Sequence, residues 1–312
     1  MVCLYRDNAK MTHHIPVLQD DMVNAVMTDP DGTYLDATFG RGGHARALLR
    51  QLSPKATLLV LDRDPDAYRV AIDLSREDSR VHPRRGAFSE IDSILSSNRC
   101  VGLSGLMMDI GVSSPQLDDP SRGFSFMRSG PLDMRMDPES GESAASWLNR
   151  VDLADLIKVL RELGDEKNAR SIAKSIVNER PLSTTAELVS AINSAGSRRD
   201  PRKHSATRVF QAVRMHVNDE LVELKRGIEA GFHRLADGGR IGVLTFHSIE
   251  HSVVRQKFRS LVRPELPRRL PVRGTPLGRA TYVVKAKRPD ATETDKNPRS
   301  RGALLQVVER IE

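Results

Sequence analysis

Apolar runs alternate with amphipathic segments over the first third of the chain. Residues 57–61 (TLLVL) form a continuous apolar run, which is typical of a strand buried on both faces of a parallel sheet. Apolar residues at helical spacing predict helices within 13–27 and at 44–52. We predict the other strands at 33–38, 80–82, 102–108 and 240–246. This alternation predicts an α/β domain.

The pattern changes after residue 118. Residues 143–195 are predicted as consecutive helices without strands, at 144–149, 153–163, 166–179 and 185–195. A long helix over 206–235, broken near Asn218, leads back to the strands. Alternating residues at 280–286 and 303–310 predict a final hairpin. We therefore expect one α/β domain made of residues 1–118 and 216–312, with a helical domain inserted at 119–215.

The charge balance points to a polyanionic partner. The net charge is +7 and the sequence pI about 9.6, which favours nucleic acid as the partner. A basic protein without such a partner is the alternative until the charges are located. Basic residues concentrate at 197–214 and at 259–301. We interpret residues 259–301 as a flexible basic arm.

The cysteines and the apolar segments exclude several classes of protein. Two cysteines are too few for a disulfide framework or a cysteine zinc site, and we expect no metal. The start of the chain lacks the pattern of a signal peptide. Since no window is apolar and long enough to span a bilayer, we expect a cytoplasmic protein without a membrane partner.

The stretch 33–44 (TYLDATFGRGGH) carries the first candidate chemistry. Gly40 and Gly42 lie between a predicted strand and a predicted helix, where the main chain can contact a ligand closely. The spacing from Gly40 to Ala45 also fits a dinucleotide fingerprint. Asp36 favours S-adenosylmethionine instead, because a carboxylate repels a pyrophosphate and attracts a sulfonium and an ammonium group. A solvated Asp36 beside a simple turn is the alternative.

Other polar or aromatic residues follow the predicted strands. Asp62 is placed to accept hydrogen bonds from two ribose hydroxyls, with a surface acid as the alternative. Phe88 either covers an adenine ring or packs in the core. Asp109, followed by a stiff polar loop at 110–116, could hold an amino group. His247 also ends a predicted strand, and a histidine satisfied within the sheet is the interpretation we favour there.

Two basic segments could contact RNA. Arginines and aromatic residues are interleaved in the polar loop 117–142, as a splayed-out RNA base and its phosphates would require. Residues 197–214 add a cluster of basic side chains. The alternative for the loop is a solvated segment with a small satellite core, and the alternative for residues 197–214 is a solvated face. The candidate RNA contacts are Arg122, Arg135, Lys203, His204, Arg208 and Arg214.

Several motifs together resemble the bacterial 16S ribosomal RNA cytosine-N4 methyltransferases, which act on cytidine 1402. The most specific are 109–119 (DIGVSSPQLDD), 122–137 (RGFSFMRSGPLDMRMD) and 207–218 (TRVFQAVRMHVN). The resemblance implies a class I S-adenosylmethionine-dependent methyltransferase fold, Rossmann-like, with an inserted helical domain. It implies 16S ribosomal RNA of the small subunit as partner. The cofactor positions that it implies are Gly42, Gly43, His44, Asp62, Phe88, Asp109 and Gln116.

Under this hypothesis Asp109 is the catalytic residue, and it orients the cytosine amino group toward the methyl group. A nicotinamide-dependent oxidoreductase and a non-catalytic RNA-binding protein are the rival interpretations. The sequence leaves the oligomeric state open, with a homodimer among the options.

Overall fold

The computed structural model describes residues 16–98, 100, 102–196, 205–263 and 278–311. Its centre is a seven-stranded sheet with the order β3-β2-β1-β4-β5-β7-β6. The strands β1 to β5 are parallel, and β7 is antiparallel to both β5 and β6. Their bounds are β1 Thr33–Asp36, β2 Thr57–Asp62, β3 Val81–Arg85, β4 Leu103–Asp109, β5 Leu235–Thr245, β6 Ala280–Lys287 and β7 Leu304–Arg310. This topology confirms the predicted Rossmann-like class I sheet.

Helices cover both faces of the sheet. One face packs against α1 (Gln19–Val26), α2 (Gly43–Leu49) and α3 (Pro65–Glu77), and the other against α4 (Ile91–Ser97), α11 (Glu220–His233) and α12 (Ser248–Val262). Neighbouring strand residues alternate between the two cores: Leu58 belongs to the first, Leu59 to the second. Because both faces are covered, the apolar run at 57–61 has no polar side. Each fully buried aliphatic side chain favours the folded state by about 1.5–3 kcal/mol relative to leaving that side chain exposed to water.

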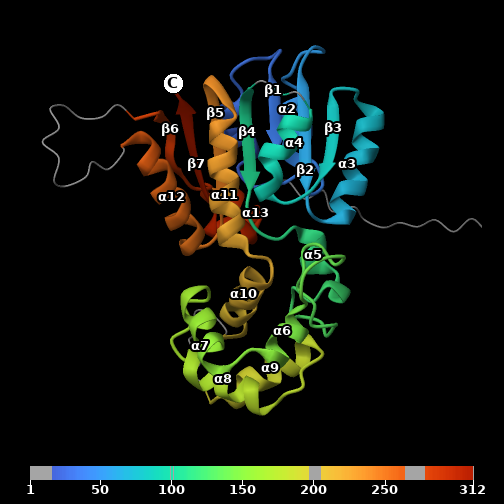
Figure 1. Ribbon diagram of the computed structural model, residues 1–312, viewed down its shortest axis with the longest axis vertical. Coiled ribbons are helices and arrows are strands. Elements are labelled where there is room, and N and C mark those ends of the chain that lie inside the picture. Colours follow the sequence, from blue (N-terminus) through green and yellow to red (C-terminus); the bar gives the residue numbers. More distant parts are fainter. Residues whose placement is uncertain (1–15, 99, 101, 197–204, 264–277, 312) are drawn as a thin grey trace, which may run out of the picture.

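A helical body lies below the carboxyl ends of the strands in Figure 1. It comprises α5 (Ser114–Asp118), the 3₁₀ helix η2 (Pro120–Arg122), α6 (Ala144–Arg150), α7 (Leu153–Glu162), α8 (Ala169–Asn178), α9 (Thr185–Ser194) and α10 (Ser205–Val217). Its buried residues, from Phe124 to Val213, form a third core separate from the two cores of the sheet. The boundaries at residues 119 and 215 stay a prediction, and this core lies between them.

The chain returns to the sheet through a break between α10 and α11. Asp219 has a φ of 50°, which ends one helix and starts the next, so the predicted interruption near Asn218 is confirmed. The strand β5 begins at Leu235, five residues earlier than the predicted start at 240, and it includes Gly238 and Gly239.

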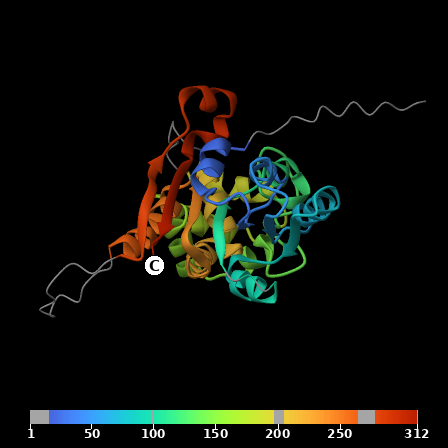
Figure 2. The same cartoon turned by 90° about the horizontal axis from the view of Figure 1, so that it is seen from above.

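The C-terminal segment differs from the expected flexible arm. Its described parts belong to α12, to the predicted hairpin of β6 and β7, and to two short helices, α13 (Ala291–Lys296) and η3 (Pro298–Gly302). Residues 264–277 lie outside the described residues. Figure 2 shows the red connection between β6 and β7 beside the blue α1. There Leu18 N–H donates to Glu293 Oε1 at 2.7 Å. Among the described residues, helices long and apolar enough to cross a membrane are absent.

Candidate functional site

Three aspartates lie at the carboxyl ends of neighbouring parallel strands. Asp36 ends β1, Asp62 ends β2 and Asp109 ends β4, and β1 pairs with both other strands. Their side chains therefore meet at one edge of the sheet, where the strand order reverses and open α/β sheets bind ligands. The sequence analysis had placed Asp62 and Asp109 at such strand ends, and Asp36 within the strand predicted at 33–38.

The glycine turn between β1 and α2 approaches the same edge. Gly40 and Gly42 have φ angles of 54° and 76°, which favour glycine. A Cβ atom on Gly42 would lie 2.7 Å from the Phe39 ring, and one on Gly43 would lie 2.1 Å from Cγ of Pro16. The turn therefore excludes side chains at two of the predicted cofactor positions, Gly42 and Gly43, because Phe39 and Pro16 fill that space, whereas Gly40 lines a pocket.

Asp62 is held by main-chain hydrogen bonds. Its Oδ2 accepts from Gly40 N–H at 2.8 Å and its Oδ1 from Asp64 N–H at 2.9 Å. Burial raises the pKa of Asp62 to about 6, although both hydrogen bonds oppose this shift. Each carboxylate oxygen can accept a second hydrogen bond, so the predicted contact to two hydroxyls remains available.

Asp36 and Asp109 flank a buried histidine. His44, at the start of α2, is 5% exposed, and its Nε2 lies 3.5 Å from Asp109 Oδ2. Burial alone would lower the pKa of His44, but the carboxylates of Asp109 and Asp36 outweigh it, and the pKa is raised. Burial raises the pKa of Asp36 to about 6, against the attraction of His44. The arrangement holds one imidazole between two acids.

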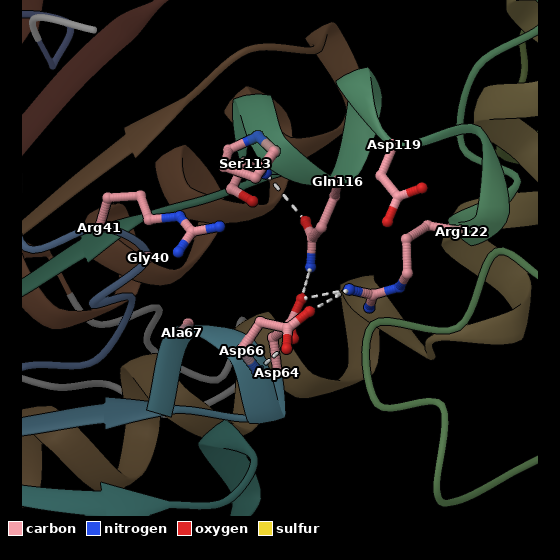
Figure 3. A pocket seen from close by; sticks show the side chains of 10 residues that line it. Gly40, Arg41, Asp64, Asp66, Ala67, Ser113, Gln116, Asp119 and Arg122 are labelled. Carbon is pink, nitrogen blue, oxygen red and sulfur yellow. Dashed lines mark hydrogen bonds and ion pairs between the residues drawn. The ribbon is translucent and has the colours of Figure 1, made fainter. Parts of the chain in front are cut away.

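A pocket of about 160 Å³ lies beside the glycine turn and is lined by Gly40, Arg41, Asp64, Ser113, Gln116 and Arg122, among others. Figure 3 shows Gln116 and Arg122 both pointing toward Asp64. Asp64 Oδ2 accepts from Gln116 Nε2 at 2.7 Å and from Arg122 Nη1 at 3.0 Å. Gln116 Oε1 also accepts from Ser113 N–H at 2.9 Å. Gln116, a predicted cofactor contact, thus binds other residues of the protein through both ends of its amide.

We expect Asp64→Ala to destabilise the protein by about 3 kcal/mol. Asp64 Oδ1 caps α3 through Asp66 N–H, and losing such a cap costs about 1 kcal/mol. The change also removes the partner of Arg122, whose side chain is only 12% exposed, and leaving a charged group without its hydrogen bond costs about 1.5–3 kcal/mol. Urea unfolding of both Asp64→Ala and Asp66→Ala checks this. An equal loss in the half-exposed Asp66 variant would contradict it.

The predicted RNA contacts do not form one exposed surface. Arg122 also donates to the carbonyls of Arg135 and Met136 at 3.2 and 2.9 Å, and Arg135 pairs with Asp133 at 2.7 Å. Arg208 Nη1 lies 3.8 Å from Glu166 Oε2. Lys203 and His204 lie outside the described residues. Arg122 and Arg135 are therefore engaged within the protein rather than directed freely to solvent.

Arg214 departs furthest from the predicted role. Its guanidinium is 9% exposed and bonds Glu220 through two nitrogens, at 2.7 and 2.8 Å. Glu250 Oε1 lies 3.8 Å from Arg214 Nη2, and Glu250 Oε2 accepts from the main-chain N–H groups of Phe246 and His247. The guanidinium of Arg214 is thus held in a buried ion pair, and an RNA phosphate cannot reach it without opening the pair.

Asn218 is a junction residue that the sequence reasoning noticed only as a helix break. Its Nδ2 donates to the carbonyls of Met134 and Arg214, at 2.7 and 2.9 Å, and its Oδ1 accepts from Met136 N–H at 2.7 Å. Arg63, directly after β2, donates to Asn218 O at 3.0 Å. A polar residue at a helix break was the only signal in the sequence. These bonds tie the helical body to the ligand edge of the sheet.

Phe88 and His247 each follow a strand of the parallel sheet, β3 and β5. Phe88 opens the 3₁₀ helix η1 (Phe88–Glu90) after β3 and packs partly against the core under α4 and α11. A Cβ atom on Gly227 would lie 2.7 Å from Cβ of Phe88, which fixes the backbone position of this aromatic residue. His247 precedes the first turn of α12 and is partly buried. Both alternatives stated for Phe88, core packing and contact with an adenine, are compatible with this half-buried place.

Known proteins resemble this chain over nearly its whole length. The model of the MraW methylase family matches residues 11–311. Ribosomal RNA small subunit methyltransferase H of Chromohalobacter salexigens is 50% identical over 312 residues, covering 98% of this chain and 94% of that protein. The proteins of the same name from Thioalkalivibrio sulfidiphilus and Pseudoalteromonas atlantica are 47% and 43% identical, each over 96% of this chain and 97% and 98% of theirs.

Proposed function

Because this chain belongs to the MraW methylase family, we propose that it transfers a methyl group to the exocyclic N4 of cytidine 1402 in the 16S RNA of the small ribosomal subunit. The names of the similar proteins support a small-subunit ribosomal RNA as substrate. The observation that supports the amine as target is Asp109, a partly exposed carboxylate at the end of β4 beside the glycine turn.

The residues at the ligand edge fit S-adenosylmethionine, the cofactor of this class of methylase. Gly40, where an added Cβ would meet nothing closer than 4.0 Å, lines the pocket, and Asp36, Asp62 and Asp109 concentrate negative charge at this edge. S-adenosylmethionine supplies a methyl group already activated by a sulfonium. Three carboxylates would attract its positive groups and would repel the pyrophosphate of a dinucleotide. The same charges therefore disfavour a nicotinamide-dependent oxidoreductase.

Asp109 is the group that we assign to the target amine. Its carboxylate can accept a hydrogen bond from the amino group and favour a pyramidal nitrogen with an available lone pair. The carbonyls of Ser113 and Pro115 are alternative acceptors, and each already accepts one hydrogen bond, from Leu117 N–H and Asp119 N–H. Asp109 is held in place because its own N–H donates to Thr38 Oγ1 at 2.6 Å. The chain thus mainly supplies position and orientation.

The target base must leave its stack to reach Asp109, and we assign its RNA flanks to the helical body. Met127 lies 82% exposed on the loop between η2 and α6, next to Arg128. We keep Arg135, Lys203, His204 and Arg208 as proposed RNA contacts. We propose instead that Arg122 and Arg214 fix the orientation of the helical body relative to the sheet, because their guanidinium groups are bonded to Asp64 and Glu220.

A labelling experiment tests this function. The protein is incubated with methyl-labelled S-adenosylmethionine and small subunits that lack the modification, and the RNA is digested to nucleosides. We expect the label in N4-methylcytidine, at position 1402. Label in another nucleoside would overturn the amine as target. Salt-sensitive RNA binding without any labelled nucleoside would favour the non-catalytic RNA-binding alternative.

A further inference from the structure

The imidazole of His44 is buried, and hydrogen bonds within the protein do not satisfy its ring nitrogens. Among the described residues, neither ring nitrogen has a hydrogen-bond partner of normal geometry, and the closest acid, Asp109, lies 3.5 Å from Nε2. Leaving a buried polar group without a good hydrogen bond costs about 1–3 kcal/mol. A buried polar group without a good partner requires an explanation, and a catalytic role is one such explanation.

The charged groups around His44 are few and identifiable. Asp36 of β1 and Asp109 of β4 are the carboxylates that act on it, and Asp62 acts on Asp36 in turn. On α1, which packs against α2, Asp20 is exposed and Asp21 pairs with Lys287. On α2 itself, Arg46 pairs with Glu77 at 3.1 Å. The protonation of His44 is therefore set by Asp36 and Asp109.

Methylation of an amine requires a proton acceptor. The N4–carbon bond forms, the carbon–sulfur bond breaks with its electron pair remaining on sulfur, and an N–H bond must break with its electrons remaining on nitrogen. One proton therefore has to leave the amine. At the same time the crevice loses the positive charge of the sulfonium. A base close to Asp109 could accept the proton and restore that charge.

We propose that His44 accepts this proton through Asp109: the proton moves from the amine to a carboxylate oxygen of Asp109, and the same proton then moves on to Nε2 of His44, which restores the carboxylate. The proposal rests on the proposed function and adds to it the group that receives the proton. Asp109 contacts the amine, and His44 acts through Asp109. For this to work His44 must be neutral before transfer and a cation afterwards. The second carboxylate, Asp36, stabilises that cation.

Binding of the cofactor should convert His44 to the neutral form that can accept a proton. S-adenosylmethionine carries one net positive charge at neutral pH, whereas S-adenosylhomocysteine carries none. A cation beside the Asp36–His44–Asp109 cluster favours loss of the proton from His44. Binding of the cofactor should therefore release a proton, and its affinity should rise with pH by up to about tenfold per unit below the pKa of His44. The affinity for S-adenosylhomocysteine should show little of this dependence.

Calorimetry tests the proposal without turnover. Cofactor binding is measured in buffers of different ionisation enthalpy from pH 5.5 to 8.5, with the wild-type chain, His44→Asn, Asp36→Asn and His82→Asn. His82, exposed on β3, is the matched control. We expect the wild type and His82→Asn to release the same number of protons, and His44→Asn to release fewer, because Asp36 and Asp62, whose pKa values burial raises to about 6, still lose protons when a cation binds. Asp36→Asn should shift the release to lower pH, because removing this acid lowers the pKa of His44.

Single-turnover rates on small subunits complete the test. The wild-type rate should rise with pH until His44 is neutral, and Asp36→Asn should move this rise to lower pH. A wild type that makes N4-methylcytidine but releases no proton on binding, or an Asp36→Asn variant with unchanged profiles, would overturn the proposal. These results remain decisive even where His44→Asn does not fold. A wild type without N4-methylcytidine would instead overturn the proposed function.

Discussion

Asp109→Asn should reduce methyl transfer by about a thousandfold, the upper range for losing one group that stabilises a transition state. The amide keeps the size of the side chain but presents NH₂ where an acceptor is needed, and it cannot pass a proton to His44. RNA binding should stay nearly unchanged, because Asp109 contacts one base and not the phosphates that dominate affinity.

The measurement is a single-turnover rate at saturating cofactor, combined with RNA binding at several salt concentrations. Asp73→Asn is the matched control, since this acid is exposed on α3 and pairs only with Arg76 at 2.8 Å. We expect the control to transfer methyl groups at the wild-type rate. Wild-type turnover in Asp109→Asn would remove Asp109 from the role of orienting the amine.

Arg214→Met should lower the free energy of unfolding by about 3–5 kcal/mol at pH 8, the cost of breaking a buried ion pair from one side. The change leaves Glu220 and Glu250, which are 7% and 0% exposed, without their cation. Arg226→Met on the exposed face of α11 is the matched control, with an expected change within about 0.5 kcal/mol. Urea unfolding of both variants measures the difference.

The free energy of unfolding that Arg214→Met loses should be smaller at low pH than at high pH. Burial raises the pKa of Glu250 to about 7 from an ordinary value of 4.5, against the attraction of Arg214. The folded state therefore binds this proton more tightly than the unfolded state, and Glu250 favours folding increasingly as the pH falls from about 7 to 4.5. Without Arg214 this preference grows. The cost of Arg214→Met should thus be smaller at pH 6 than at pH 8, and a larger cost at pH 6 would contradict this account.

Strands could be predicted best where a run of apolar residues shows that both faces of the strand are buried. The run 57–61 is apolar at every position but Thr57 because both faces of β2 are covered, so strand and fold class could be predicted from it. Acids directly after such runs fall at the ligand edge by the geometry of parallel strands. Asp36, Asp62 and Asp109 could therefore be predicted from local sequence alone.

The arginines were harder to place, because a charge in a sequence does not reveal its partner. Arg122 bonds an acid 58 positions earlier, and Arg214 bonds Glu220 across a helix break and lies beside Glu250 of α12. Both were predicted to contact RNA on composition, as was Arg135, although its acid, Asp133, lies only two positions away. The burial of His44 was likewise hidden, since a histidine at a helix start is usually solvated. The pairings of Arg122 and Arg214 and the burial of His44 arise from tertiary contacts that local patterns do not encode, whereas the pair of Arg135 with Asp133 is local.

The insertion of the helical body between β4 and β5 has a consequence for synthesis on the ribosome. The strand β4 pairs with β1 as soon as residues 103–109 emerge, but its other neighbour begins only at Leu235. At ordinary elongation rates this edge waits on the order of ten seconds for its partner. During that interval an apolar, unpaired strand edge is a site for aggregation. The helical body, built from contacts close in sequence, can fold during this pause and stand beside the exposed edge until β5 arrives.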